Sequence, residues 1–373
     1  MAHPQQDAPA HEHRRRRPAD AGAAPLVSPA VDMDLLTALC EAAGTSGREE
    51  RVRAVVAPRL EELCDRVETD PLGNLSGVRE GGPRRLMLAA HMDEIGLMVT
   101  HIDDNGFVRM IPIGGWDART LVGQSVSVHG REDLEGVVGL PPVHLLDQKD
   151  RAKALEVTDL AIDLGLPADR VRELVRAGDV ATRVRALRRL GDLVTGKSLD
   201  DRVGVFVMLE ALRAAGPSAA EVVATATVQE EVGLRGARVA TARIRPDIAL
   251  AIDTCPANDG PGAPAGGATT RLGKGTAIRV MDASAIGAPA LVDLLTRIAT
   301  ERDIPHQFHV ANRGGTDTGS LQLSGEGAVA GCVSIPTRYV HSSVEACHPD
   351  DIEASIRLVA GLIERIGELG IPA

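Results

Sequence analysis

Several short apolar runs in this chain end directly in acidic or imidazole side chains. The runs and the residues after them are 86–90 before His91, 222–228 before Glu230 and Glu231, and 248–252 before Asp253. Apolar runs without polar alternation are typical of strands that are covered on both faces. Open α/β sheets built from such strands gather ligands at the strands' carboxyl ends. The sequence therefore predicts an α/β fold with a functional site at one edge of its sheet.

Two further clusters extend this pattern. Residues 328–335 form a fourth apolar run with His341 shortly after it, and Asp200 opens an apolar helix that runs through Leu212. The residues that we expect to meet are His91, Asp200, Glu231, Asp253 and His341. Two imidazoles and three carboxylates suit a pair of borderline divalent ions, with zinc, cobalt or manganese as candidates.

The adjacent Glu230 and Glu231 offer two roles at one place. Buried carboxylates are costly unless a cation offsets them, and one can hold a metal while its neighbour moves protons. A solvated pair at a strand-to-loop junction is the alternative reading for these two residues alone, because charged side chains are mostly exposed. The four other clusters favour the metal site.

The motifs around these residues carry a family resemblance. They are AHMDEIG (90–96), GKSLDDRVG (196–204), VQEEVGLRGA (228–237), AIDTCPA (251–257), RGGTDTGSLQLSGEG (313–327) and IPTRYVHS (335–342). In this order they resemble the di-metal aminopeptidases of metallopeptidase family forty-two, over roughly residues 31 to 368. Several matched motifs together are specific, whereas each alone is weak.

The resemblance implies roles for individual residues. The implied metal ligands are His91, Asp200, Glu231, Asp253 and His341. Asp200 resembles the bridging carboxylate, although the sequence alone could reverse it with Asp201. Glu230 resembles the general base, and Asp93 resembles the acid that orients the His91 imidazole. The cofactors implied are two divalent ions per subunit, zinc or cobalt first and manganese second.

The function implied is hydrolysis of N-terminal residues from peptides by metal-activated water, with a glutamate as general base. A di-metal amidase or deacylase of small acylated amines is the alternative. A non-catalytic assembly subunit would be expected to lack Glu230 or a ligand, and all six residues are present.

The expected architecture is a three-layer αβα catalytic domain that is interrupted by a small β-barrel-like insert. We expect a disordered leader at 1–30, a discontinuous catalytic domain at 31–103 and 192–373, and the insert at 104–191, where short strands alternate with turn residues. The resemblance implies that the insert mediates dimerisation, within a homo-oligomer of two to twelve subunits.

Composition excludes other classes. A net charge of −11 argues against a nucleic-acid partner, since phosphate binding needs clustered Lys and Arg. Without an apolar run of about 18 residues, no membrane span is expected. The five cysteines have no CxxC spacing and form an odd number, which favours a reducing cytoplasm over a disulfide framework.

Overall fold

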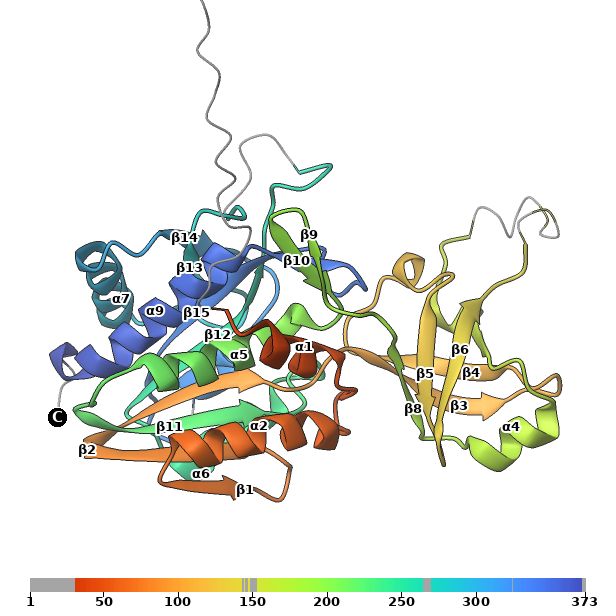
Figure 1. The fold of residues 1–373 in the computed structure, drawn as a ribbon, viewed down its shortest axis with the longest axis horizontal. Coiled ribbons are helices and arrows are strands. Elements are labelled where there is room, and N and C mark those ends of the chain that lie inside the picture. Colours follow the sequence, from red (N-terminus) through yellow and green to blue (C-terminus); the bar gives the residue numbers. More distant parts are fainter. Residues whose placement is uncertain are drawn as a thin grey trace, which may run out of the picture.

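The predicted apolar runs form the centre of a large mixed sheet in this computed structural model (Figure 1). The structure describes residues 31–142, 144, 147, 153–263, 270–323 and 325–370. The expected leader at 1–30 lies outside the described residues.

The large sheet has ten strands, in the order β1-β2-β12-β15-β16-β10-β9, with β11 beside β2 and β13 between β15 and β14. Their bounds are β1 Arg66–Thr69, β2 Leu75–His91, β9 Arg188–Leu190, β10 Leu193–Gly196, β11 Ala220–Thr227, β12 Ile248–Pro256, β13 Thr276–Met281, β14 His306–Val310, β15 Val329–Arg338 and β16 Glu345–Cys347. The strands β11, β2, β12 and β15 are parallel neighbours, so their carboxyl ends meet at one edge.

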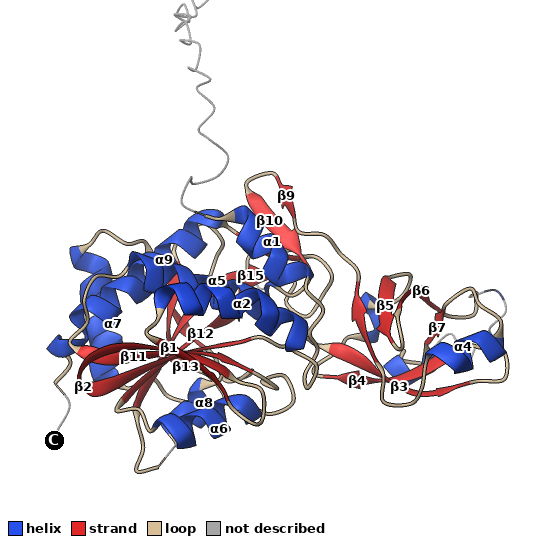
Figure 2. Ribbon diagram, turned by 60° about the horizontal axis from the view of Figure 1, so that its bottom comes forward, coloured by secondary structure: helices blue, strands red, loops and turns tan. Residues whose placement is uncertain are grey.

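Helices cover both faces of this sheet (Figure 2). One face carries α1 Met33–Glu41, α2 Glu50–Leu63, α5 Leu199–Ala214, α7 Pro289–Glu301 and α9 Pro349–Arg365, and the other carries α6 Arg235–Ile244 and α8 Thr318–Gln322. The short 3₁₀ helix η4, Ile366–Glu368, follows α9. The predicted three-layer αβα architecture is confirmed.

Side-chain size separates the two faces of the central strands. In β12, Ile248, Leu250 and Ile252 pack into the core beneath the five helices, whereas Ala249 and Ala251 face α6 and α8. Because successive strand residues point to opposite faces, this alternation of large and small apolar residues gives one thick and one thin layer. The run looks uniformly apolar in sequence because both faces are buried.

The remaining strands close into a separate barrel in the order β3-β4-β7-β6-β5-β8 (Figure 1). Their bounds are β3 Gly96–Ile102, β4 Val108–Ile113, β5 Ser125–His129, β6 Asp133–Gly139, β7 Ala161–Asp163 and β8 Val180–Arg183, with η1 Ala118–Thr120, η3 Val157–Asp159 and α4 Ala168–Leu174. Apolar side chains such as Leu97, Val126 and Ile162 fill the barrel.

The barrel's limits differ from the expected insert at 104–191. Its first strand begins at Gly96, and its last strand ends at Arg183, while β9 pairs with β10 in the large sheet. The reason at the first boundary is that 96–102 follows the site loop at 91–95 directly and is not set apart from it by a turn signal in the sequence.

Within the residues that the structure describes, no helix combines the length and apolar character needed to cross a membrane.

Candidate metal centre

The predicted site residues converge at the carboxyl edge of the large sheet. His91 ends β2, and Thr227 at the end of β11 lies opposite it in the parallel register, which brings Glu230 and Glu231 beside His91. A cavity of about 800 Å³ opens here. The six predicted side chains that line it are His91, Asp200, Glu230, Glu231, Asp253 and His341.

Asp200 lies between the two imidazoles. Its Oδ1 is 3.4 Å from His91 Nε2, and its Oδ2 is 3.5 Å from His341 Nε2. Each carboxylate oxygen therefore faces a different ring nitrogen, which is the arrangement expected of a carboxylate that is shared by two ions. This geometry depends on the non-helical backbone of Asp200 at the start of α5.

Glu231 faces His341, and Glu230 faces His91. Glu231 Oε1 lies 3.1 Å from His341 Nε2, within ion-pair distance, and it has no well-formed hydrogen bond. Glu230 Oε2 lies 4.0 Å from His91 Nε2. The adjacent glutamates are thus directed toward different halves of the cluster.

Asp93 lies behind the cluster, with its side chain fully buried. Its Oδ2 accepts hydrogen bonds from Ser46 Oγ at 2.6 Å and from the Glu231 N–H at 3.2 Å, and its Oδ1 accepts one from the Glu230 N–H at 3.0 Å. Its carbonyl oxygen is 3.1 Å from His91 Nδ1. Asp93 therefore fixes both the backbone of the glutamate pair and the orientation of the imidazole.

Asp201 lies close enough to His91 and Asp253 to join a ligand group with them. However, its Oδ2 accepts the His91 N–H and its Oδ1 accepts the Gly204 N–H, both at 3.1 Å. Both oxygens of Asp201 are therefore engaged by the backbone, whereas those of Asp200 face the imidazoles.

The electrostatics of the cluster favour binding of a cation. Burial and the charge of Asp200 raise the pKa of Asp253 to about 8, and burial raises the pKa of Glu230 well above its ordinary value. Burial alone would lower the pKa of His341, but the neighbouring Glu231 carboxylate raises it to about 9. Carboxylates packed this densely are stabilised by a bound cation, because a buried charge must be paired or coordinated.

The residues fit a pair of divalent ions. Potential ligand atoms of Asp200, Glu231 and His341 lie within 4.8 Å of one another, and those of His91 and Asp253 form part of a second such group. Imidazole nitrogen and carboxylate oxygen are the donors that zinc and similar ions accept.

Two contributors to the site were missed in the sequence. Glu345 of β16 accepts hydrogen bonds from the backbone of both Asp200 and His341. Gly115, between β4 and η1, lies so close to His341 that a Cβ built on it would be 3.2 Å from the ring Nδ1. Both depend on contacts between distant segments, so only the spacing of Glu345 four residues after His341 could have drawn attention to it.

Three other residues, Asp317, His348 and Cys255, lie outside the lining of the cavity and contact only neighbouring protein groups. Asp317 precedes α8, is buried, and accepts a hydrogen bond from Thr227 Oγ1 at 2.6 Å. His348 caps α9 by accepting the Asp350 N–H. Cys255 is buried beside Thr270.

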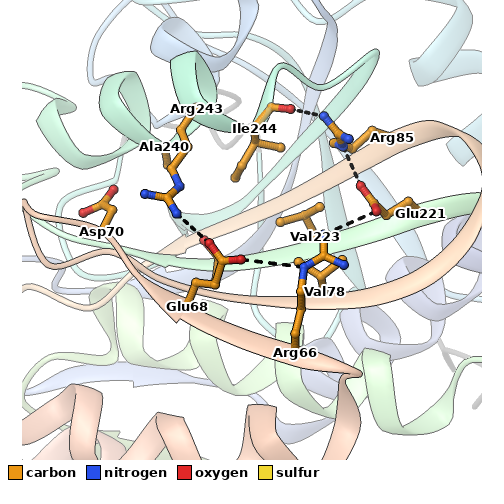
Figure 3. A pocket seen from close by; sticks show the side chains of 11 residues that line it. Arg66, Glu68, Asp70, Val78, Arg85, Glu221, Val223, Ala240, Arg243 and Ile244 are labelled. Carbon is orange, nitrogen blue, oxygen red and sulfur yellow. Dashed lines mark hydrogen bonds and ion pairs between the residues drawn. The ribbon is translucent and has the colours of Figure 1, made fainter.

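A second hollow, of about 160 Å³, lies on the α6 side of β1, β2 and β11 (Figure 3). Its charged side chains pair with one another, as Arg243 does with Glu68 at 2.6 Å and Arg85 with Glu221 at 2.5 Å. Because these charges already pair with one another, the hollow does not present free ligand atoms for a metal as the sheet edge does.

A three-layer αβα fold, with imidazoles and carboxylates gathered at the carboxyl ends of its parallel strands, is typical of the metal-dependent hydrolases. Residues 73–358 match the family model of the M42 glutamyl aminopeptidases. The chain belongs to this family, and it is a metal-dependent aminopeptidase.

Named relatives agree with this assignment. The lysyl aminopeptidase of Pyrococcus furiosus is 35% identical over 90% of this chain and 98% of its own length. The aminopeptidase from Desulfurococcus kamchatkensis is 40% identical, with a TM-score of 0.86 over 91% of this chain and 97% of that one. The Pyrococcus horikoshii TET1 peptidase, described as assembling into a tetrahedron or a large octahedral shell, is 33% identical, with a TM-score of 0.80 over 89% and 99% of the two chains.

Proposed function

We propose that the chain releases N-terminal residues from peptides by using two divalent ions per subunit, zinc or cobalt, with manganese as a further candidate. Asp200 would serve both ions, His91 and Asp253 would complete the ligand set of one, and Glu231 and His341 would complete that of the other. The observation that carries this proposal is the position of Asp200, whose two oxygens face the two imidazole Nε2 atoms at 3.4 and 3.5 Å.

When bound, the ions would polarise the scissile carbonyl and lower the pKa of the attacking water. Glu230 accepts the proton of that water and returns it to the leaving amine, as a general base and then a general acid. Its carboxylate suits this role because it lines the cavity and lies farther from the imidazoles than that of Glu231. Asp93 does not line the cavity, and it acts by holding the His91 ring so that Nε2 faces Asp200.

The cavity wall away from the ligands favours neutral or acidic N-terminal side chains. Among the described residues that line it, the only carboxylates belong to Asp200, Glu230, Glu231 and Asp253. The lining also includes two cationic side chains, Arg313 and Arg279, and the second of these pairs with Asp282 at 3.1 Å. A lysine side chain would find no acidic partner there, so we expect glutamyl and leucyl substrates to be cleaved faster than lysyl ones.

A substrate panel tests this function. Aminoacyl-nitroanilides and acyl-amino acids are assayed side by side, before and after chelation and after addition of zinc or cobalt. We expect hydrolysis of aminoacyl-nitroanilides, its loss on chelation, and its recovery with metal. Cleavage of acyl-amino acids alone would favour the amidase reading, and full activity in protein shown by elemental analysis to be metal-free would overturn the proposal.

We further propose that the protein is a homo-oligomer that acts in the cytoplasm. The described assemblies of the TET1 relative support the first statement. All five cysteines are free thiols, which supports a reducing compartment. Light scattering at micromolar concentration checks the assembly, and a protein that is only monomeric would contradict it.

A further inference from the structure

Glu345 connects the backbones of two candidate ligands. It begins the short strand β16, which pairs with β10 on one side and β15 on the other, and its side chain is only 1% exposed. Its Oε2 accepts the Asp200 N–H, and its Oε1 accepts the His341 N–H, each at 2.9 Å. One buried carboxylate therefore spans the start of α5 and the loop after β15.

The N–H groups of Asp200 and His341 belong to backbone with irregular dihedral angles. His341 has φ 64°, in the left-handed region, and Asp200 departs from helical dihedrals at the start of α5. A left-handed conformation is unfavourable for a residue that carries a side chain, so it persists only where surrounding contacts enforce it. The hydrogen bond to Glu345 is such a contact at His341.

We propose that Glu345 is a positioning residue for the metal centre, which sets the relative placement of Asp200 and His341 by accepting one backbone N–H from each. This inference rests on the proposed metal-dependent function. Asp200, Glu231 and His341 form one compact ligand group, so a shift of either clamped residue would change that group's geometry. Partners behind the ligands of metal sites commonly set ligand orientation in this way.

The role requires a carboxylate. A glutamine has nearly the same size but only one acceptor oxygen, so its NH₂ group would face one of the two N–H donors. Glu345→Gln therefore removes one of the two hydrogen bonds without leaving a cavity. Glu345→Asp keeps both oxygens on a shorter stem and folds with less perturbation of charge.

The chain contains a matched control in Asp351. This side chain is fully buried, and its two oxygens accept the N–H groups of Gly273 and Gly275, each at 2.7 Å. It accepts two backbone N–H groups as Glu345 does, but neither of its donors, Gly273 and Gly275, is a candidate metal ligand. Asp351→Asn thus measures how the loss of one such carboxylate-to-backbone hydrogen bond affects folding alone.

The experiment is a zinc titration of metal-free, full-length protein by calorimetry with a competing chelator, together with thermal unfolding of each metal-free variant. We expect Glu345→Gln to weaken zinc binding by roughly 10–100-fold and to lower kcat more than KM, with Glu345→Asp between it and the wild type. Asp351→Asn should lower the unfolding temperature and bind zinc as the wild type does.

Wild-type zinc affinity in Glu345→Gln and Glu345→Asp would overturn the positioning role, as would equal weakening in Asp351→Asn. A wild-type protein that binds none of zinc, cobalt and manganese in such a titration would instead overturn the proposed function, and the positioning role with it.

Discussion

The large sheet and the barrel bury different kinds of side chain. At the sheet edge, Asp200 and Asp253 are 9% and 6% exposed, and Glu231 lies against them with its charge unmatched by any lysine or arginine within the described ion pairs. The barrel is filled with valine, leucine and isoleucine, while ion pairs such as Arg119–Asp117 and Arg170–Glu173 lie on its surface.

This difference separates the groups that do chemistry from those that maintain the fold. Burying several carboxylates together costs free energy that packing does not return, so the arrangement implies a bound cation. The core of the barrel consists of apolar side chains, whose burial stabilises it. Yet the two regions touch at Gly115, which lies against the His341 ring. Substitutions in each region can test how far their roles are separate.

The largest effect is expected for Asp200→Asn. This change keeps the side chain's size and removes the negative charge that both ions would share, so we expect loss of bound metal and a fall in kcat of at least roughly 10³-fold. Glu173→Gln removes one charge from a surface ion pair of the barrel and should leave activity and metal content unchanged. Equal losses of metal and of kcat in both variants would show that the effect comes from the change in net charge and not from the loss of a metal ligand.

A smaller effect is expected for Gly115→Ala, which tests the contact between the regions. The added Cβ would lie 3.2 Å from His341 Nδ1 and 3.4 Å from Cε1, so the ring must move by tenths of an ångström. Because misplacement by 1 Å can cost 10²-fold, we expect a roughly tenfold loss of kcat/KM.

Gly139→Ala in β6 is the control, since no described atom lies within 4 Å of a Cβ built there. Unchanged kinetics for Gly115→Ala would show that the barrel loop does not constrain the ligand.

The smallest effect on catalysis is expected for Ile162→Ala in the barrel core. Ile162 is fully buried, and its truncation should lower the free energy of unfolding by about 2–5 kcal/mol. Zinc content and kcat of the folded fraction should stay at wild-type values. Denaturant titration and elemental analysis check these two outcomes. A parallel loss of zinc would show that metal binding at the sheet edge depends on the stability of the barrel.

The large sheet and its site could be predicted from the sequence because their signals are local. Buried central strands such as 248–252 are continuous apolar runs, and Asp253 follows directly. Parallel neighbours bring such strand ends together without further information, as the pairing of Thr227 with His91 shows.

The remaining features depend on register and on contacts between distant segments. The barrel's first strand, β3, begins at Gly96 and follows the site loop without a separating turn signal, whereas the sequence predicts an insert from residue 104. Glu345 acquires its partners only through the pairing of β16 with β10 and β15. Gly115 is a turn glycine in sequence, and its packing against His341 appears only when the barrel is placed beside the sheet.

The most direct test of the central claim is to measure ion content and rate together in Glu230→Gln and Glu231→Gln. Glu230→Gln should retain two ions per subunit while kcat falls by roughly 10²–10⁴, the usual contribution of a positioned general base. Glu231→Gln should lose an ion, and excess zinc should partly restore its activity. Loss of metal from Glu230→Gln with full retention in Glu231→Gln would contradict the assignment of the two glutamates.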